Sequence, residues 1–225
     1  MRFVRKLHRW LSLVILIQVL IWLVSGLYFG WVGHQSLAAH DYFQSIPATP
    51  VGSVFYPENA LIERFDNVKS VEVRSISDTA QYLVLTIDGS RHYVNAQTGE
   101  RWQTSAPLAA KLARQSYNGP GSVKEVQAVT GSDEIIDWNK PGYRVIFTDE
   151  IDTRVYIDAA SGEVVDHRNN NWWLSDWMFR LHFMDYSGER DFNSLLNIIA
   201  ATIALWFSLS GLILLGRSLK HRQLF

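Results

Sequence analysis

The chain has 225 residues, of which 19% are charged and 13% are aromatic, and it contains no cysteine. The absence of cysteine excludes disulfides, thiolate zinc sites, iron–sulfur clusters and haem attached through cysteine. A net charge of −1 gives no reason to expect nucleic-acid binding, and the common phosphate-loop, dinucleotide, zinc-protease and serine-hydrolase motifs do not occur in the sequence.

The first predicted element is a membrane-spanning helix over the apolar residues 11–30. About 20 residues at 1.5 Å each cross the roughly 30 Å hydrocarbon core of a bilayer. A cleaved signal peptide is the alternative, since residues 36–38 resemble a cleavage site, but the apolar run is longer than the usual signal-peptide core. We therefore expect residues 1–32 to form a cytoplasmic N-terminus and an uncleaved helix.

Residues 33–171 follow as a predicted outer domain that contains an internal repeat. Residues Tyr93–Glu100 match residues Tyr156–Glu163 in the pattern Y-[VI]-[ND]-A-x-[ST]-G-E. This pattern indicates a strand that ends in a tight turn, where Gly99 and Gly162 are free to adopt positive φ. The offset between the two copies, about 63 residues, is the length of a small module.

Each copy of the turn is preceded by a predicted helix and two predicted strands. In the first copy these are Pro57–Phe65, Val71–Ile76 and Tyr82–Ile87, and in the second they are Ser105–Gln115, Val123–Val129 and Tyr143–Thr148. Proline is favoured at the first helical position, and Ser105 is a suitable N-cap. The sequence thus predicts an α+β domain of two modules, each a helix packed on an antiparallel sheet.

Two further elements complete the chain. Residues 172–191 read as an interfacial amphipathic segment, with Trp173 and Trp177 one turn apart. Residues 192–225 contain a second apolar run, residues 195–215, and a basic tail. This run is the second predicted membrane-spanning helix, which returns the chain to the side from which it started.

The distribution of charge predicts the topology. All 22 acidic residues lie between Asp41 and Asp191, an interval with 14 Lys and Arg and therefore a net charge of −8. The two ends carry seven Lys and Arg and no acidic residue. Because basic residues next to membrane helices stay in the cytoplasm, we expect both termini inside and the acidic domain in the periplasm of a bacterial inner membrane.

These features resemble a known family. The repeated turn resembles the strand ends of PepSY modules. The opening helix, Lys6-Leu7-His8-Arg9-Trp10-Leu11 through Ser25-Gly26-Leu27, is similar to that of PepSY-associated transmembrane proteins, although Ser12 replaces their usual glycine. Leu181-His182 and Leu209-Ser210-Gly211-Leu212 resemble later segments of the family. The resemblance covers nearly the whole chain and is to a short two-helix form, similar to the VciB-type ferric reductases. Longer members include haem-containing ferric and siderophore reductases.

Histidines are the residues of this chain that can ligate haem iron, and haem ligation needs them paired at one membrane depth. Two such levels are expected: His8 with His221 on the inner side, and His34 or His40 with His182 on the outer side. His8 and His34 lie about 39 Å apart along a helix and cannot serve the same haem. An ordinary interfacial or surface role is the alternative for each, and His92 and His167 are expected to be strand or loop residues.

One face of the first helix has small residues that allow close approach. This face is formed by His8, Ser12, Ile15, Val19, Trp22, Gly26 and Gly30. Small residues on this face allow either a porphyrin or another helix to approach closely. Helix packing is the favoured interpretation of these small residues.

Two groups of acidic residues are candidate sites that attract a ferric ion or a cationic chelate. The groups are Asp133, Glu134 and Asp137, and Asp149, Glu150 and Asp152. The alternative is that they line solvated hairpin turns, with Arg144 and Arg154 neutralising part of the charge.

The resemblance implies haem b as cofactor and reduction of ferric iron as function, with a quinol or flavoprotein as the electron donor. Two helices cannot surround a porphyrin, whereas four can, so haem binding implies a homodimer. The alternative, from a different class, is a membrane-tethered PepSY module that binds or regulates a peptidase or a larger membrane complex without redox activity.

Overall fold

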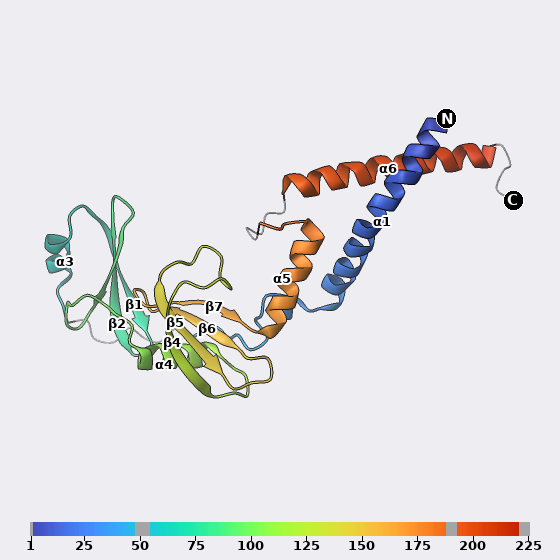
Figure 1. Cartoon of the computed structure of the whole chain (residues 1–225). Coiled ribbons are helices and arrows are strands. Elements are labelled where there is room, and N and C mark those ends of the chain that lie inside the picture. Colours follow the sequence, from blue (N-terminus) through green and yellow to red (C-terminus); the bar gives the residue numbers. More distant parts are fainter. Residues whose placement is uncertain (1, 48–54, 188–192, 221–225) are drawn as a thin grey trace. The chain divides into compact units, whose positions relative to one another are not determined.

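The computed structural model describes residues 2–47, 55–187 and 193–220, and it divides the chain into two compact units. One unit combines Met1–Leu37 with Trp172–Phe225, and the other is Ala38–Asn171. The long helices belong to the first unit and all the described strands to the second (Figure 1). The second unit nearly coincides with the predicted outer domain, residues 33–171.

The helical unit contains α1 (Arg2–Trp31), α2 (His34–Leu37), α5 (Asn170–Phe183, from Trp172 onward) and α6 (Leu195–Lys220). In α1 and α6 the segments His8–Trp31 and Leu195–Lys220 have a mean hydropathy of 2.3, so both are long and apolar enough to span a membrane. Both long helices match the sequence prediction, whereas the short α2 was not predicted. The predicted segment 172–191 is helical to Phe183, and residues 188–192 lie outside the described part.

The apolar side chains of these two helices are not used to build a protein core. In the most apolar 18-residue stretch of each helix, only 6% is buried within the protein. Leu20, Leu23 and Leu212 are among the large side chains left exposed. The core helix of a soluble protein buries such residues, so α1 and α6 have the surface of helices that contact lipid or a partner.

The second unit contains two antiparallel sheets, each preceded by a helix. The first sheet follows α3 (Glu58–Arg64) and has the order β1 (Val68–Ile76), β2 (Thr79–Thr86), β3 (Arg91–Asn95). The second sheet follows α4 (Ala106–Ser116) and has the order β4 (Val123–Thr130), β5 (Pro141–Phe147), β6 (Arg154–Asp158), β7 (Val164–Arg168). The predicted helix and three strands of each repeat are confirmed, and β7 is an addition to the second.

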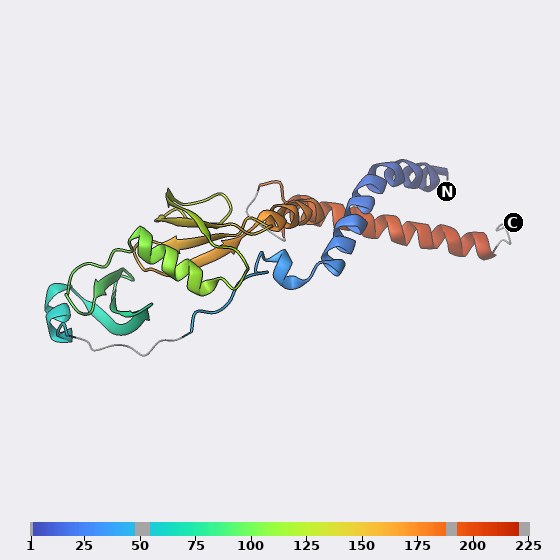
Figure 2. The same ribbon diagram turned by 90° about the horizontal axis from the view of Figure 1, so that it is seen from below.

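Each helix packs an apolar face on its own sheet. In α4 the buried residues Ala109 and Leu112 lie against the second sheet, and Figure 2 shows the helix across one face of that sheet. Ser105 is the N-cap and accepts a hydrogen bond from the Leu108 amide, as predicted. In α3 the buried Leu61 packs on the first sheet. Pro57 precedes α3 as its N-cap residue and is not the first helical residue, which corrects the prediction by one position.

The repeated sequence forms the same turn twice. In the first copy the Asn95 carboxamide accepts hydrogen bonds from the amides of residues 97 and 98, and Gly99 has φ +74°. In the second the Asp158 carboxylate accepts from the amides of residues 160 and 161, and Gly162 has φ +75°. The prediction of equivalent turns with positive φ is confirmed. β1 and β4 also share an irregularity of register near their starts.

The two modules are joined directly through the second turn. The Gln81 side chain donates to the Ser161 carbonyl at 3.0 Å, and the Thr104 amide donates to the Ala159 carbonyl at 2.9 Å. Trp102, between the modules, is buried together with residues of the second sheet. The turn that ends β6 therefore lies against the first module, and the surface beside it is formed by both modules.

Candidate functional site

His182, on the last turn of α5, is held against α1. Its Nδ1 lies 2.9 Å from the Oγ of Ser25, and its ring meets Phe29 edge-on at a centroid distance of 5.5 Å. A Cβ added at Gly26 would lie 3.6 Å from His182 Cε1, so the glycine keeps the neighbouring helix close to the imidazole ring. The side chain thus packs on the Ser25-Gly26 step of α1.

Two other side chains of α1 fix the end of α5 that carries His182. Trp22 donates from Nε1 to the carbonyl oxygen of His182 at 2.7 Å, and Gln18 donates to the carbonyl oxygen of Leu181 at 3.5 Å. The last carbonyls of a helix have no partners within that helix, so they accept from outside. Gln18, Trp22 and Ser25 are spaced as neighbours on one helix face, which places all three donors or acceptors toward α5.

His8, near the start of α1, has a closely similar environment on α6. Its Nδ1 lies 2.9 Å from the Oγ of Ser210. Its ring stacks on Phe207 with a centroid distance of 4.3 Å and an interplanar angle of 10°. A Cβ added at Gly211 would lie 3.5 Å from His8 Cε1. The two histidines therefore each pack on a Ser-Gly step of a neighbouring helix.

The hydrogen bonds of the two serines determine which ring nitrogen carries the proton. Ser25 Oγ lies 2.6 Å from the Ile21 carbonyl oxygen, and Ser210 Oγ lies 2.8 Å from the Phe207 carbonyl oxygen. Because a carbonyl oxygen can only accept, each serine hydroxyl donates its single proton to that carbonyl. The hydroxyl oxygen must then accept a hydrogen bond from the histidine ring. Nδ1 then carries the proton in both rings, and in the neutral imidazole Nε2 keeps its lone pair.

This arrangement is the one in which imidazole ligates a metal through Nε2. Metal-ligating histidines commonly donate their other ring N–H to a fixed acceptor, which orients the ring and raises its basicity. Among the residues that the structure describes, no side chain is hydrogen-bonded to Nε2 of His8 or of His182. The sequence identified both histidines and both Ser-Gly steps. It did not predict that the serines accept from the histidines, because that pairing joins helices far apart in the sequence.

The two sites lie at different depths along α1. Ser25, which contacts His182, follows His8 by 17 residues, about 26 Å along a helix. The face that joins them was predicted from its small residues, and its Ile15 is buried in the structure. Helix packing accounts for Gly26 in this chain, whereas a Cβ at Gly30 would meet no atom within 4 Å.

The remaining predicted ligands are placed differently. His34 is the first residue of α2 and its side chain is exposed. His40 belongs to the other unit, where its Nε2 lies 3.0 Å from an oxygen of Asp166, so one ring nitrogen is already engaged. His221 lies outside the described residues. The pairing of His182 with His34 or His40, and of His8 with His221, therefore stays a prediction.

The two histidines expected to be structural are strand residues. His92 lies on β3 and stacks on Phe65 at 4.6 Å. His167 lies on β7, is buried, and hydrogen-bonds Ser116 through Nε2 at 3.0 Å. Burial, followed by the nearby His40, lowers the pKa of His167 to about 4.

The acidic group before β5 is largely occupied by partners from the protein. Glu134 accepts two hydrogen bonds from Arg154, at 2.7 and 2.9 Å, and one from Tyr156 at 2.5 Å. The prediction that Arg154 neutralises part of this charge is confirmed. Arg144 instead donates to Gln127, at 2.9 and 2.5 Å. Asp133 and Asp137 are exposed beside them.

The second acidic group forms the turn between β5 and β6. Asp149 accepts from the amides of Ile151 and Thr153, both at 3.1 Å, and from the Tyr117 hydroxyl at 2.8 Å. Glu150 accepts from Tyr42, and Asp152 accepts from Asn170. Over the described residues, no group of three or more His, Asp or Glu side chains is arranged to hold a metal ion. The solvated-turn interpretation is the one that these contacts favour.

No family model, no curated protein and no solved structure matches this chain. The similarity to PepSY proteins therefore rests on the quoted motifs and stays a prediction.

Proposed function

We propose that this chain is a haem-dependent electron-transfer protein of the bacterial cytoplasmic membrane that reduces ferric iron, or a ferric chelate, on the periplasmic side. Iron is the substrate, and one electron converts one ferric ion to a ferrous ion for uptake. The electron comes from a membrane quinol or a reduced flavoprotein. The two membrane-length helices and the two histidine–serine contacts support this proposal.

The observation that carries the proposal is the contact of Nδ1 of His8 and of His182 with a serine hydroxyl, from which the protonation state of each ring is inferred. Each ring donates from Nδ1 to a serine whose own proton is committed to a backbone carbonyl. Nε2 is left as the available donor of a lone pair, and imidazole nitrogen is a common axial ligand of haem iron. A histidine with only a structural role at the surface does not need this arrangement, yet it occurs at both His8 and His182.

The residues present fit haem b. His8 and His182 would each hold a separate haem through Nε2, and the adjacent glycines, Gly211 and Gly26, place no side chain against the Cε1 edges of the rings. A bound haem would supply a one-electron redox centre. The serines hold the proton at Nδ1, and the stacked Phe207 limits rotation of the His8 ring. With α1 spanning the membrane, as proposed, a spacing of about 26 Å would put the two sites near opposite ends of that span.

A homodimer completes the proposed sites. In the described part of one chain, neither His8 nor His182 is paired with a second histidine across an open space. A twofold axis along the membrane normal brings two copies of His8 to one level and two of His182 to the other. The same axis covers apolar residues of α1 and α6 that one chain leaves exposed.

The proposal is tested on the purified full chain in detergent. We expect a haem absorption band in the wild type. His8→Ala and His182→Ala should each lower haem content and ferric reduction severalfold. Ser25→Ala and Ser210→Ala should keep the histidines but shift the haem midpoint potential, since the Nδ1 proton loses its acceptor.

Matched variants separate ligation from general damage. Ser208→Ala removes a hydroxyl of α6 that bonds the Ala204 carbonyl and should leave the potential unchanged. His92→Ala should leave haem content unchanged, because His92 lies in the other unit. A colourless, monomeric wild-type protein that still supports iron acquisition would overturn the proposal and favour the membrane-tethered binding module.

A further inference from the structure

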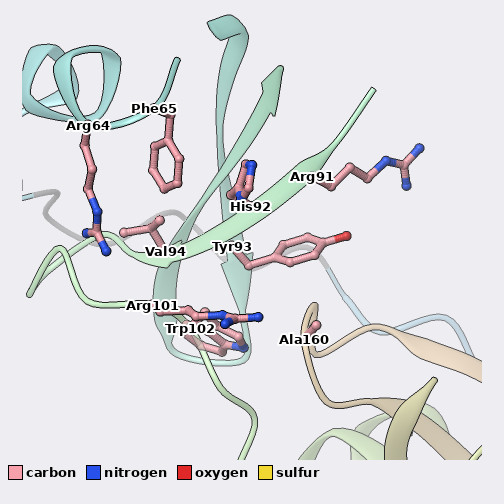
Figure 3. A pocket seen from close by; sticks show the side chains of 9 residues that line it. All are labelled: Arg64, Phe65, Arg91, His92, Tyr93, Val94, Arg101, Trp102 and Ala160. Atoms are coloured by element: carbon pink, nitrogen blue, oxygen red, sulfur yellow. The ribbon is translucent and has the colours of Figure 1, made fainter. Parts of the chain in front are cut away.

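The strand domain contains a cavity whose charge is opposite to that of the domain around it. The strand domain, Ala38–Asn171, contains 18 acidic residues and 12 Lys and Arg and therefore has a net charge of −6. Yet a cavity of about 350 Å³ in this domain is lined by Arg64, Arg91 and Arg101 and by no acidic residue (Figure 3). Its other walls include Phe65, Tyr93 and Trp102.

The guanidinium groups of Arg64, Arg91 and Arg101 form no ion pair within the described part of the protein. Arg64 donates to the carbonyl oxygen of Gly99 at 2.6 Å, a neutral partner, which anchors it at the cavity edge. In the described part of the chain, none of the three guanidinium groups is therefore neutralised by an ion pair with a carboxylate.

Four acidic residues line the hollows that adjoin the cavity: Asp66 and Asp88 in the hollow beside Arg64, and Asp158 and Glu163 in those beside Ala160. In the adjoining hollows beside Ala160, the Asp158 carboxylate accepts from the turn amides and Glu163 pairs with Arg74. Lys140 lines both of these hollows and extends the basic surface across the junction of the two modules. All four carboxylates lie outside the cavity lining, so the charged groups that line the cavity itself are cationic.

The arrangement of the cationic groups indicates the shape of the ligand. Figure 3 shows Arg91 and Tyr93 extending to one side of β3 and Arg64 descending toward the strand from the other. Separated guanidinium groups fit a ligand with several anionic groups better than one compact anion. Guanidinium forks bind carboxylates through paired hydrogen bonds. The aromatic walls favour a carbon skeleton over an inorganic anion.

We propose that this cavity binds a small organic polycarboxylate, with Arg91 and Arg101 as its principal charged contacts. The ligand lies where the two modules meet, so binding couples the first sheet to the turn that ends β6. The site is independent of the histidine sites in the helical unit and requires neither haem nor a particular topology.

The test is isothermal titration calorimetry of the purified full chain with tricarballylate, citrate, acetate and pyrophosphate. The two tricarboxylates should bind, acetate and pyrophosphate should bind at least tenfold more weakly, and added salt should weaken binding. Arg91→Gln and Arg101→Gln should each weaken tricarballylate binding about tenfold. Both side chains are exposed, so circular dichroism of the variants should match that of the wild type.

Lys124→Gln is the matched control, because it removes one exposed positive charge of β4 outside the cavity. It should leave tricarballylate binding unchanged. Failure of both tricarboxylates to bind the wild type overturns the proposal. So does equal weakening by Lys124→Gln, which would indicate a general charge effect, or tighter binding of pyrophosphate, which would show that the aromatic walls do not select an organic ligand.

Discussion

At the scale of single residues, serine determines the state of three histidines. Ser25 and Ser210 accept from Nδ1 of His182 and His8, which leaves Nε2 available. Ser116 also gives its proton to a backbone carbonyl, that of Ala113, but it accepts from Nε2 of His167. The lone pair of His167 is then at Nδ1, which is buried and hydrogen-bonded to no described atom. The same local rule leaves Nε2 unprotonated in His8 and His182 and Nδ1 unprotonated in His167.

His167 makes the stability of the strand domain dependent on pH. Burial, and then the charge of His40, depress its pKa from 6.5 to about 4, partly offset by Asp166. Between pH 4 and 6.5, His167 is protonated in the unfolded chain but stays neutral in the folded chain. The stabilisation is complete above about pH 6.5 and is lost as the pH falls toward 4, by up to about 3 kcal/mol.

The measurement is denaturant unfolding of the full chain in detergent between pH 4 and 7. His167→Gln removes the titrating group and should flatten the pH dependence relative to the wild type, although it lowers stability at neutral pH. His34→Gln, at an exposed residue of α2, should leave the slope as it is. A wild-type slope retained in His167→Gln would assign the effect to the domain's carboxylates instead.

At the scale of elements, the repeated turn shows how one sequence pattern meets two environments. Gly99 and Gly162 have nearly the same positive φ. A Cβ at Gly99 would overlap the ring of Tyr56, whereas one at Gly162 would lie 3.0 Å from the Cγ2 of Ile76. Backbone conformation requires glycine at both positions, and packing adds a second requirement at Gly99.

This difference predicts an order of destabilisation by alanine. Gly89 has φ +86° and no atom within 4 Å of an added Cβ, so Gly89→Ala should cost only the backbone strain, roughly 1–2 kcal/mol. Gly99→Ala should cost about 1–3 kcal/mol more, because the Tyr56 ring must move. Thermal unfolding followed by circular dichroism measures both. An equal loss of stability in the two variants would mean that the Tyr56 ring can move away from residue 99 without cost.

At the scale of the whole molecule, hydropathy and charge divide the chain in the same way. α1 and α6 expose their apolar side chains, and basic residues without acidic ones flank both helices at the chain ends. The segment between the two helices carries every acidic residue, and 18 of the 22 lie in the strand domain, Ala38–Asn171. An even number of crossings places both ends on one side of a membrane, and the basic residues favour the cytoplasmic side.

The expected topology is tested with reporter fusions in bacterial cells. A reporter after Phe225 should be active in the cytoplasm, and one inserted at Gly121, between α4 and β4, should be active in the periplasm. A fusion before residue 2 provides the control, since it should agree with the one after Phe225. If the reporters at Phe225 and Gly121 indicate the same compartment, the membrane proposal fails.

The sequence predicted the elements and the repeat because those features are local. Hydropathy over about 20 residues identified α1 and α6, and the Tyr-to-Glu motif identified two equivalent turns. β7 and α2 were not predicted, because β7 needs β6 as its partner and α2 is a single turn. Pro57 was misplaced by one residue, since helix boundaries depend on contacts as well as on local preference.

The candidate site divides in the same way. The sequence by itself determined that His8, His182 and two Ser-Gly steps are present at the ends of apolar segments. Only the tertiary structure decided that each histidine meets the serine of a different helix, because those partners are 202 and 157 residues apart. It also decided that Glu134 and Asp149 serve the strand domain. Arg64, Arg91 and Arg101 likewise share a cavity only because the chain folds α3 and the segment after β3 around one strand. Hydrogen bonds and charge pairs depend on distances in space, which a linear pattern does not contain.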